Sequence, residues 1–154
     1  MTIQRLDPIG RSEAAQAVLE AKRRKGITWA RIAEELDRSK VWTAAALLGR
    51  HTISKEQAIT VGKLLGLDEA IRDALQLPPV RGTESLDPGE PVTTRLEEIV
   101  QLYGGAVNEL VREEFGDGVM SAVDFRMDVD RTEDSEGERV VITLDGKYLP
   151  YREF

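Results

Sequence analysis

The chain has 154 residues, of which 41% are hydrophobic and 32% charged, a composition typical of a globular protein with one ordinary domain or two small ones. It has no cysteine and a single histidine, His51, which excludes disulfides, thiolate chemistry and the usual nitrogen and sulfur metal sites within one chain. Its formal charge of −7 is uneven, because residues 1–82 hold 14 Lys and Arg against 10 Asp and Glu, whereas residues 83–154 hold 7 against 18. This contrast indicates two parts with different roles.

The chain shows no sign of a membrane or export segment. Its first residues, MTIQRLDPIGRSE, lack the apolar core of a signal peptide. No apolar run approaches the roughly 20 residues that cross a bilayer. We therefore expect a cytoplasmic protein that does not associate with membranes.

The first part, residues 1–82, is predicted to be a bundle of five short helices. Apolar residues recur there at helical spacing, and each run follows a residue suited to cap a helix. Gly26 and Gly66 supply stop signals, and Pro78 and Pro79 end the last helix. The predicted capping residues are Ser12, Thr28, Ser39, Ser54 with Gln57 in a capping box, and Asp68.

The middle of this bundle, TWARIAEELDRSKVWTAAALLG, resembles the helix-turn-helix domain of phage-repressor type. That resemblance raises the alternative of a DNA-binding transcriptional regulator. A recognition helix should place Arg, Lys, Asn or Gln on base edges, but this one offers Val41, Trp42, Thr43 and three alanines after Lys40. A surplus of four positive charges is also small for binding phosphates. We therefore expect the bundle to serve assembly and not to bind nucleic acid.

Three other residues of the bundle are predicted to have ordinary structural roles. Trp29 and Trp42 are expected in its core, and His51, after a glycine and an arginine, is expected to be a solvated loop histidine rather than a proton shuttle. Residues 83–92 form a predicted linker, because the segment PPVRGTESLDPGEPVTT holds four of the six prolines.

Residues 93–154 are predicted to be a small α+β domain for catalysis and dimerisation. A helix with Leu96, Ile99, Val100 and Tyr103 on one face comes first. The helical pattern continues after Gly104 and Gly105 to Gly116, and these two glycines leave open whether the stretch is one helix or two. The alternating run from residue 123 to 129 predicts a strand, and VVITL and KYLPY flank Asp145-Gly146, which predicts a two-residue hairpin turn. So small a domain with three strands is near the lower size limit for a core of its own. We expect a second copy to complete it, in an intertwined dimer at least.

Arg95 and Glu98 are candidates for an anion site. Thr94 and Glu97 fit a capping box, which predicts Arg95 at the first helical position and Glu98 three residues later on the same face. A cation there opposes the helix dipole, but it can bind an anion together with the free N–H groups of the helix start. The alternative is an exposed ion pair without a function.

Ser121 is a third candidate, at the end of the glycine-rich stretch FGDGVMSA. The sequence offers no Ser-His-Asp set to activate it as a nucleophile, because His51 lies in the other part of the chain. The remaining alternatives are a hydrogen bond to a bound anion or a purely structural role in the turn.

Several strings of the sequence together resemble the cyanase (cyanate hydratase, or cyanate lyase) family. They are FGDGVMSAVDF, VVITLDGKYLP, RLEEIVQLYGG and the AALLG segment of the first part, and the resemblance covers nearly the whole chain. The family's catalytic residues are an arginine, a glutamate three positions later and the serine after FGDG. At the matching positions these are Arg95, Glu98 and Ser121.

The resemblance implies the bicarbonate-dependent decomposition of cyanate to ammonia and carbon dioxide through carbamate, without a metal or organic cofactor. It also implies a homodecamer of five dimers, with active sites at interfaces where arginines of several chains converge. The sequence departs from the family before Arg95, where GEPVTT stands in place of PTDP and an aromatic residue. A cyanase-like protein with weakened catalysis is therefore a further alternative.

Overall fold

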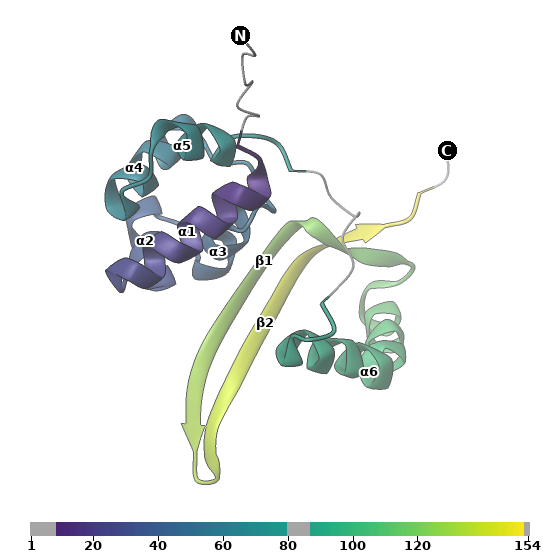
Figure 1. Ribbon diagram of the computed structural model, residues 1–154. Coiled ribbons are helices and arrows are strands. Elements are labelled where there is room, and N and C mark those ends of the chain that lie inside the picture. The colour runs from purple at the N-terminus through teal and green to yellow at the C-terminus, as the bar shows by residue number, and fades with distance from the viewer. Residues whose placement is uncertain (1–8, 80–86, 153–154) are drawn as a thin grey trace. The chain divides into compact units, whose positions relative to one another are not determined.

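The computed structural model describes residues 9–79 and 87–152, and it shows an α+β chain in which helices are followed by one two-stranded hairpin (Figure 1). Contacts divide the chain into two units, Met1–Arg81 with Met127–Thr143 and Gly82–Arg126 with Leu144–Phe154. Residues 83–86 of the predicted linker lie outside the described residues. The elements are α1 (Arg11–Lys25), α2 (Trp29–Leu36), α3 (Lys40–Leu47), α4 (Lys55–Leu65), α5 (Glu69–Leu75), α6 (Pro91–Phe115), β1 (Gly118–Asp134) and β2 (Gly137–Pro150).

Helices α1 to α5 form the predicted bundle around an apolar core (Figure 1). Its largest fully buried side chains include Ile32, Leu47 and Leu65, which come from three different helices. Trp29 and Trp42 pack against this core, as predicted. His51 is half-buried and stacks on Trp42 with a centroid distance of 6.1 Å, so the prediction of a solvated histidine is wrong.

The helix starts of the bundle follow the predicted caps, with one exception. The side chains of Thr28, Ser39 and Asp68 each accept a hydrogen bond from a backbone N–H of the first turn, and Ser54 and Gln57 form the predicted capping box. Helix α1 begins one residue earlier than Ser12 and has Gly10 as its N-cap. Local hydrogen bonds therefore account for four of these five helix starts.

Arg11, the first residue of α1, connects three segments of the bundle. One terminal nitrogen donates to the carbonyls of Ala74 at 3.4 Å and Leu75 at 2.5 Å, and the other donates to Ala46 at 3.3 Å and His51 at 2.6 Å. Partial burial lowers the pKa of the Arg11 guanidinium from its ordinary value. The cation thus satisfies carbonyl groups at the C-terminal ends of α3 and α5 and beyond α3.

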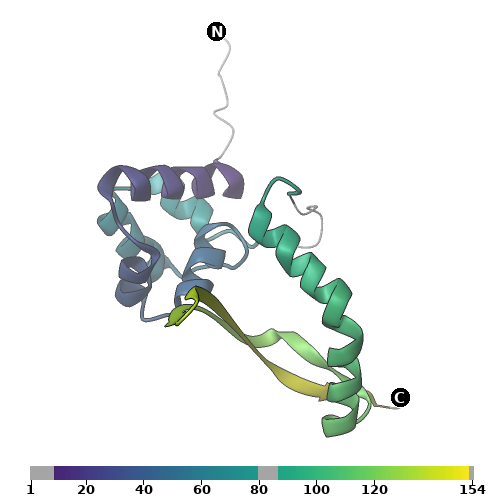
Figure 2. The same ribbon diagram turned by 90° about the horizontal axis from the view of Figure 1, so that it is seen from below.

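Helix α6 is a single continuous helix of 25 residues, which settles the choice that Gly104 and Gly105 left open (Figure 2). It begins at Pro91, a residue well suited to the first helical position. The predicted capping box at Thr94 is therefore wrong. Thr94 lies inside the helix, and its hydroxyl donates to the carbonyl of Glu90 at 3.2 Å.

The two strands form a long hairpin whose turn follows Asp134, not Asp145. Asp145 and Gly146 both lie within β2, so the predicted turn at these residues is wrong. The two segments on either side of them belong to this one strand, so the predicted third strand is also wrong. Asp145 instead forms an ion pair with Arg126 of β1 at 2.8 Å. Pairing along the whole hairpin overrides the local preference of Asp-Gly for a turn.

Candidate active site

Arg95 and Glu98 lie on the solvent-exposed surface of α6, one helical turn apart. The Arg95 Nη1 donates to the Glu98 Oε2 at 2.6 Å, and 74% of the Arg95 side chain is exposed. Because α6 starts at Pro91, Arg95 is the fifth residue of the helix rather than the first. The free N–H groups of the helix start therefore do not lie beside Arg95, and its charge does not stand at the first helical position, where it would oppose the helix dipole. The predicted orientation of Arg95 by Glu98 is what the structure shows.

Ser121 is the one buried residue within the described range 87–152, with 5% of its surface exposed. Its Oγ accepts hydrogen bonds from the backbone N–H groups of Val123 at 3.0 Å and Asp124 at 2.9 Å. A serine hydroxyl has two acceptor lone pairs and one proton. Because both lone pairs are engaged, the remaining capacity of this hydroxyl is to donate its proton. Ser121 is thus suited to bind an anion and poorly suited to act as a base.

The end of α6 is joined closely to the base of the hairpin. The Phe115 ring stacks on Tyr148 of β2 with a centroid distance of 5.0 Å, and the Tyr151 N–H donates to the carbonyl of Asp117 at 3.2 Å. Ser121 is the fourth residue of β1, directly after this junction. The junction therefore places Ser121 near the C-terminal end of α6.

Arg95, in contrast, lies near the other end of this helix. At 1.5 Å per residue, the stretch from Arg95 to Phe115 measures roughly 30 Å along the helix axis. Among the described residues, no hydrogen bond joins Ser121 to Arg95 or Glu98. The chain thus brings Arg95 and Glu98 together and leaves Ser121 apart from them.

Large apolar side chains are exposed on α6 and the hairpin. Helix α6 has no buried residue, although apolar side chains recur along it at intervals of three and four residues. The exposed residues of this stripe, called here the apolar stripe of α6, are Val92, Leu96, Ile99, Tyr103, Val107 and Leu110. Such a stripe normally faces a protein interior.

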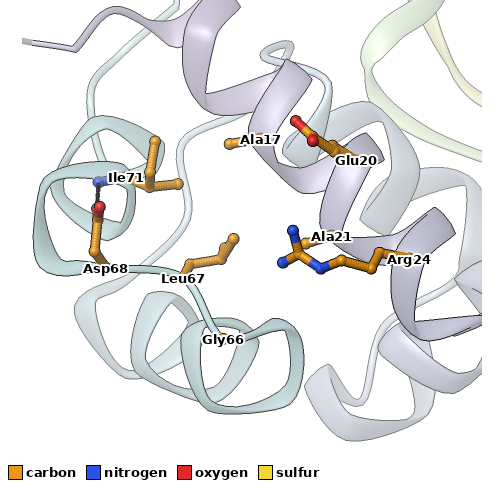
Figure 3. A pocket seen from close by; sticks show the side chains of 8 residues that line it. All are labelled: Ala17, Glu20, Ala21, Arg24, Gly66, Leu67, Asp68 and Ile71. Atoms are coloured by element: carbon orange, nitrogen blue, oxygen red, sulfur yellow. Dashed lines mark hydrogen bonds between the residues drawn. The ribbon is translucent and has the colours of Figure 1, made fainter.

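The bundle contains a hollow of about 200 Å³ between α1 and the turn from α4 to α5 (Figure 3). Its wall combines Ala21, Leu67 and Ile71 with the charged residues Glu20 and Arg24. None of the three predicted site residues lines this hollow. Its charges are of both signs, so nothing in it selects a small anion.

The described residues hold neither a cluster of metal ligands nor a helix suited to span a membrane. Within residues 9–79 and 87–152, no group of three or more His, Cys, Asp and Glu side chains is arranged to hold a metal ion. None of the described helices combines the length and apolar character that a membrane span requires.

Comparison with known proteins accounts for both parts of the chain. Residues 11–79 match the model of the N-terminal domain of cyanate hydratase, and residues 85–153 match that of the C-terminal domain of cyanate lyase. The chain belongs to the cyanate hydratase family. The resemblance seen in FGDGVMSAVDF and VVITLDGKYLP is thereby confirmed.

Individual family members match over most of their length. The cyanate hydratase of Thiobacillus denitrificans is 49% identical over 92% of this chain and 97% of its own, and that of Mycolicibacterium vanbaalenii is 45% identical over 92% and 93%. The crystal structure of cyanase from T. urticae matches with a TM-score of 0.79 and 33% identity, over 89% of this chain and 96% of that one. Over 89% of this chain the fold is thus that of a solved cyanase.

One residue beside Ser121 was missed as a site residue in the sequence. Gly146 lies on β2 at the base of the hairpin, where it faces the Ser121 backbone. The signal was an isolated glycine within a strand pattern, which often indicates a close approach of two backbones. The stronger turn preference of Asp-Gly concealed it.

Proposed function

We propose that this chain catalyses the bicarbonate-dependent decomposition of cyanate to ammonia and carbon dioxide. A bicarbonate oxygen attacks the cyanate carbon and gives a dianionic adduct. Loss of carbon dioxide and uptake of a proton leave carbamate, which takes up a second proton and releases ammonia and another carbon dioxide. The observation that carries the proposal is the match of both domains to the family, together with a polarised hydroxyl and an oriented guanidinium at the expected positions.

Arg95 binds the anions in this proposal. A guanidinium can hold two oxygens of one anion at once, and Glu98 fixes its orientation through the 2.6 Å ion pair. Unit charges about 4 Å apart interact by roughly 4 kcal/mol at an effective dielectric constant near 20. Arginines directed at the site therefore offset the repulsion between cyanate and bicarbonate and stabilise the dianionic adduct.

Ser121 supplies a hydrogen bond to the bound anions. Its two accepted N–H bonds fix the oxygen and increase the polarity of the O–H group. A donor held in place before the reaction stabilises developing negative charge without reorganisation. The chemistry is proposed to need no metal or organic cofactor, in accord with the family, because cationic and hydroxyl side chains meet the electrostatic demand.

The active site is proposed to form between copies of the chain, in a homodecamer of five dimers. Two observations support assembly: the exposed apolar stripe of α6 and the absence of buried apolar side chains in the described residues 87–152. A second chain can also bring its own Arg95 and Glu98 to Ser121. Residues 1–82 are proposed as an assembly domain, 83–92 as a linker and 93–154 as the catalytic domain.

A DNA-binding regulator is not favoured. The exposed and half-buried positions of α3 include Val41, Ala44 and Ala45, which offer no hydrogen bonds to base edges.

We propose that the enzyme acts in the cytoplasm, since a chain without cysteine suits a reducing compartment.

Release of ammonia from cyanate, measured with and without bicarbonate, tests the proposal. Release that requires both anions supports it. Ammonia release that does not depend on bicarbonate contradicts the mechanism. No release under either condition supports the alternative of a cyanase-like protein with weakened catalysis. That alternative was suggested by GEPVTT, four residues of which form the first turn of α6.

A further inference from the structure

We infer that Gly146 is a positioning residue that holds the Ser121 hydroxyl in its donating orientation. The inference rests on the proposed role of Ser121 as the donor to the bound anions. Gly146 of the Asp-Gly pair in β2 then has a role other than forming a turn.

The backbone conformation of Gly146 does not require glycine. The described glycines with positive φ are Gly26, Gly49, Gly66, Gly116 and Gly137, and Gly146 is not among them. It lies inside β2, where any residue can adopt the extended conformation. The need for glycine at this position must therefore come from its surroundings.

Those surroundings are the backbone of Ser121 itself. A Cβ atom added at Gly146 would lie 2.5 Å from the Ser121 carbonyl oxygen and 2.4 Å from the Met120 Cγ. Non-bonded carbon and oxygen atoms do not approach so closely, so one strand would have to move. A methionine side chain can adjust, but a backbone carbonyl paired in a sheet moves only with its neighbours.

Displacement of the Ser121 peptide would disturb the hydroxyl. The Oγ is held by the N–H groups of Val123 and Asp124, two and three residues further along the same strand. These bonds depend on the local path of β1 from Ser121 to Asp124. A shift of the Ser121 carbonyl changes that path, and the donated proton then no longer points in one fixed direction.

A second glycine shows that the close approach extends along the base of the hairpin. A Cβ at Gly118 would lie 2.4 Å from the Leu149 carbonyl oxygen and 2.6 Å from the Tyr148 hydroxyl. Each strand thus contributes one glycine, and Ser121 lies at one of the two points of contact. The absence of side chains at both positions lets the strands hold the serine tightly.

The test compares Gly146→Ala with Ser121→Ala and with Gly10→Ala, a control whose added Cβ meets nothing within 4 Å. In Gly146→Ala, kcat should fall about 10-fold to 100-fold while the mass of the oligomer is unchanged, because one oriented donor is weakened. Hydrogen exchange of the Val123 and Asp124 amides should become faster in both Gly146→Ala and Ser121→Ala, and it should stay slow in Gly10→Ala.

The double variant Met120→Ala/Gly146→Ala distinguishes a clash with the Ser121 backbone from a clash with the Met120 side chain. Met120→Ala removes the contact with the Met120 side chain but leaves the 2.5 Å contact with the Ser121 carbonyl, so it should not rescue Gly146→Ala. Rescue of kcat and of slow amide exchange by Met120→Ala would overturn the inference.

The exchange measurement also stands without any turnover. If the unaltered protein releases no ammonia from cyanate, the proposed function fails, whereas amide exchange still reports whether Gly146 holds Ser121. If Gly146→Ala does not fold, the comparison of the unaltered protein with Ser121→Ala decides. Equal exchange of the Val123 and Asp124 amides in these two proteins would show that the hydroxyl is not held and would contradict the inference.

Discussion

The helical bundle and the C-terminal region, residues 87–152, use the same kinds of apolar residues in opposite ways. In the bundle these side chains form a closed core, and even the guanidinium of Arg11 is used to satisfy carbonyl groups inside it. In the C-terminal region the apolar side chains of α6 are exposed, and the single buried residue is a serine. The bundle buries its apolar core within one chain. The C-terminal region has apolar residues like those of a folded domain, but it buries none of them within one chain.

This difference indicates where function resides. A region that needs a second copy to bury its apolar surface can build a site from residues of several chains. The three proposed catalytic residues all lie in that region, and two of them are far from the third along α6 and β1. Catalysis then requires that several chains assemble.

The largest expected effect comes from a charge on the apolar stripe of α6. Val107, with 55% of its surface exposed, lies three turns from Arg95. An unpaired carboxylate buried at an interface costs several kcal/mol, so Val107→Asp should weaken association by roughly 100-fold or more and abolish turnover. Light scattering measures the mass, and ammonia release measures the activity.

Asn108→Asp is the matched control, because Asn108 is exposed on the side of α6 opposite the apolar stripe. It should leave the oligomer intact. A Val107→Asp protein with the same mass as the unaltered one would show that the apolar stripe of α6 is not an interface.

The next largest effect is expected at the three site residues. Arg95→Lys keeps the charge but loses the planar fork, so it should be nearly as damaging as Arg95→Ala. Loss of one oriented donor in Ser121→Ala should lower kcat by about 100-fold to 1,000-fold. Glu98→Gln should lower activity less, because it weakens the 2.6 Å ion pair without removing the guanidinium.

Glu97→Gln is the control for these variants. Glu97 lies two residues from Arg95 on the helix and therefore faces another direction. Its activity should equal that of the unaltered protein. Loss of turnover in Glu97→Gln but not in Glu98→Gln would mean that the assignment of Glu98 is wrong.

A smaller effect, confined to stability, is expected for Arg11→Met. Four carbonyl groups would lose their donor, and we expect the free energy of unfolding of the bundle to fall by about 3 kcal/mol. Both tryptophans, Trp29 and Trp42, lie in the bundle, so tryptophan fluorescence during urea denaturation measures it selectively. An unchanged urea midpoint would show that the Arg11 hydrogen bonds contribute little.

Local signals predicted the bundle well because its helices begin at caps that depend on residues three positions apart. Thr28, Ser39, Ser54 and Asp68 were identified because each directly precedes an apolar run at helical spacing. The same reasoning misplaced the start of α6, since Thr94 and Glu97 imitate a capping box inside a helix that Pro91 already begins.

The hairpin and the site were predictable only in part. Asp145-Gly146 has the local character of a turn, but its position in β2 is decided by pairing with residues of β1 some twenty positions earlier. The ion pair of Arg95 with Glu98 followed from helical spacing, whereas the burial of Ser121 and the contact with Gly146 depend on two strands meeting. Such contacts between distant segments leave no periodic trace in the sequence.

The most direct test of an active site shared between chains is to mix two inactive chains. Arg95→Ala and Ser121→Ala proteins, co-expressed with different tags and purified as mixed oligomers, each retain the residue that the other lacks. If the active site combines Arg95 of one chain with Ser121 of another, the mixed oligomers should regain activity, up to roughly a quarter of the unaltered level, because a quarter of such sites receive both intact residues. Mixed oligomers that remain as inactive as either parent would contradict a site shared between chains.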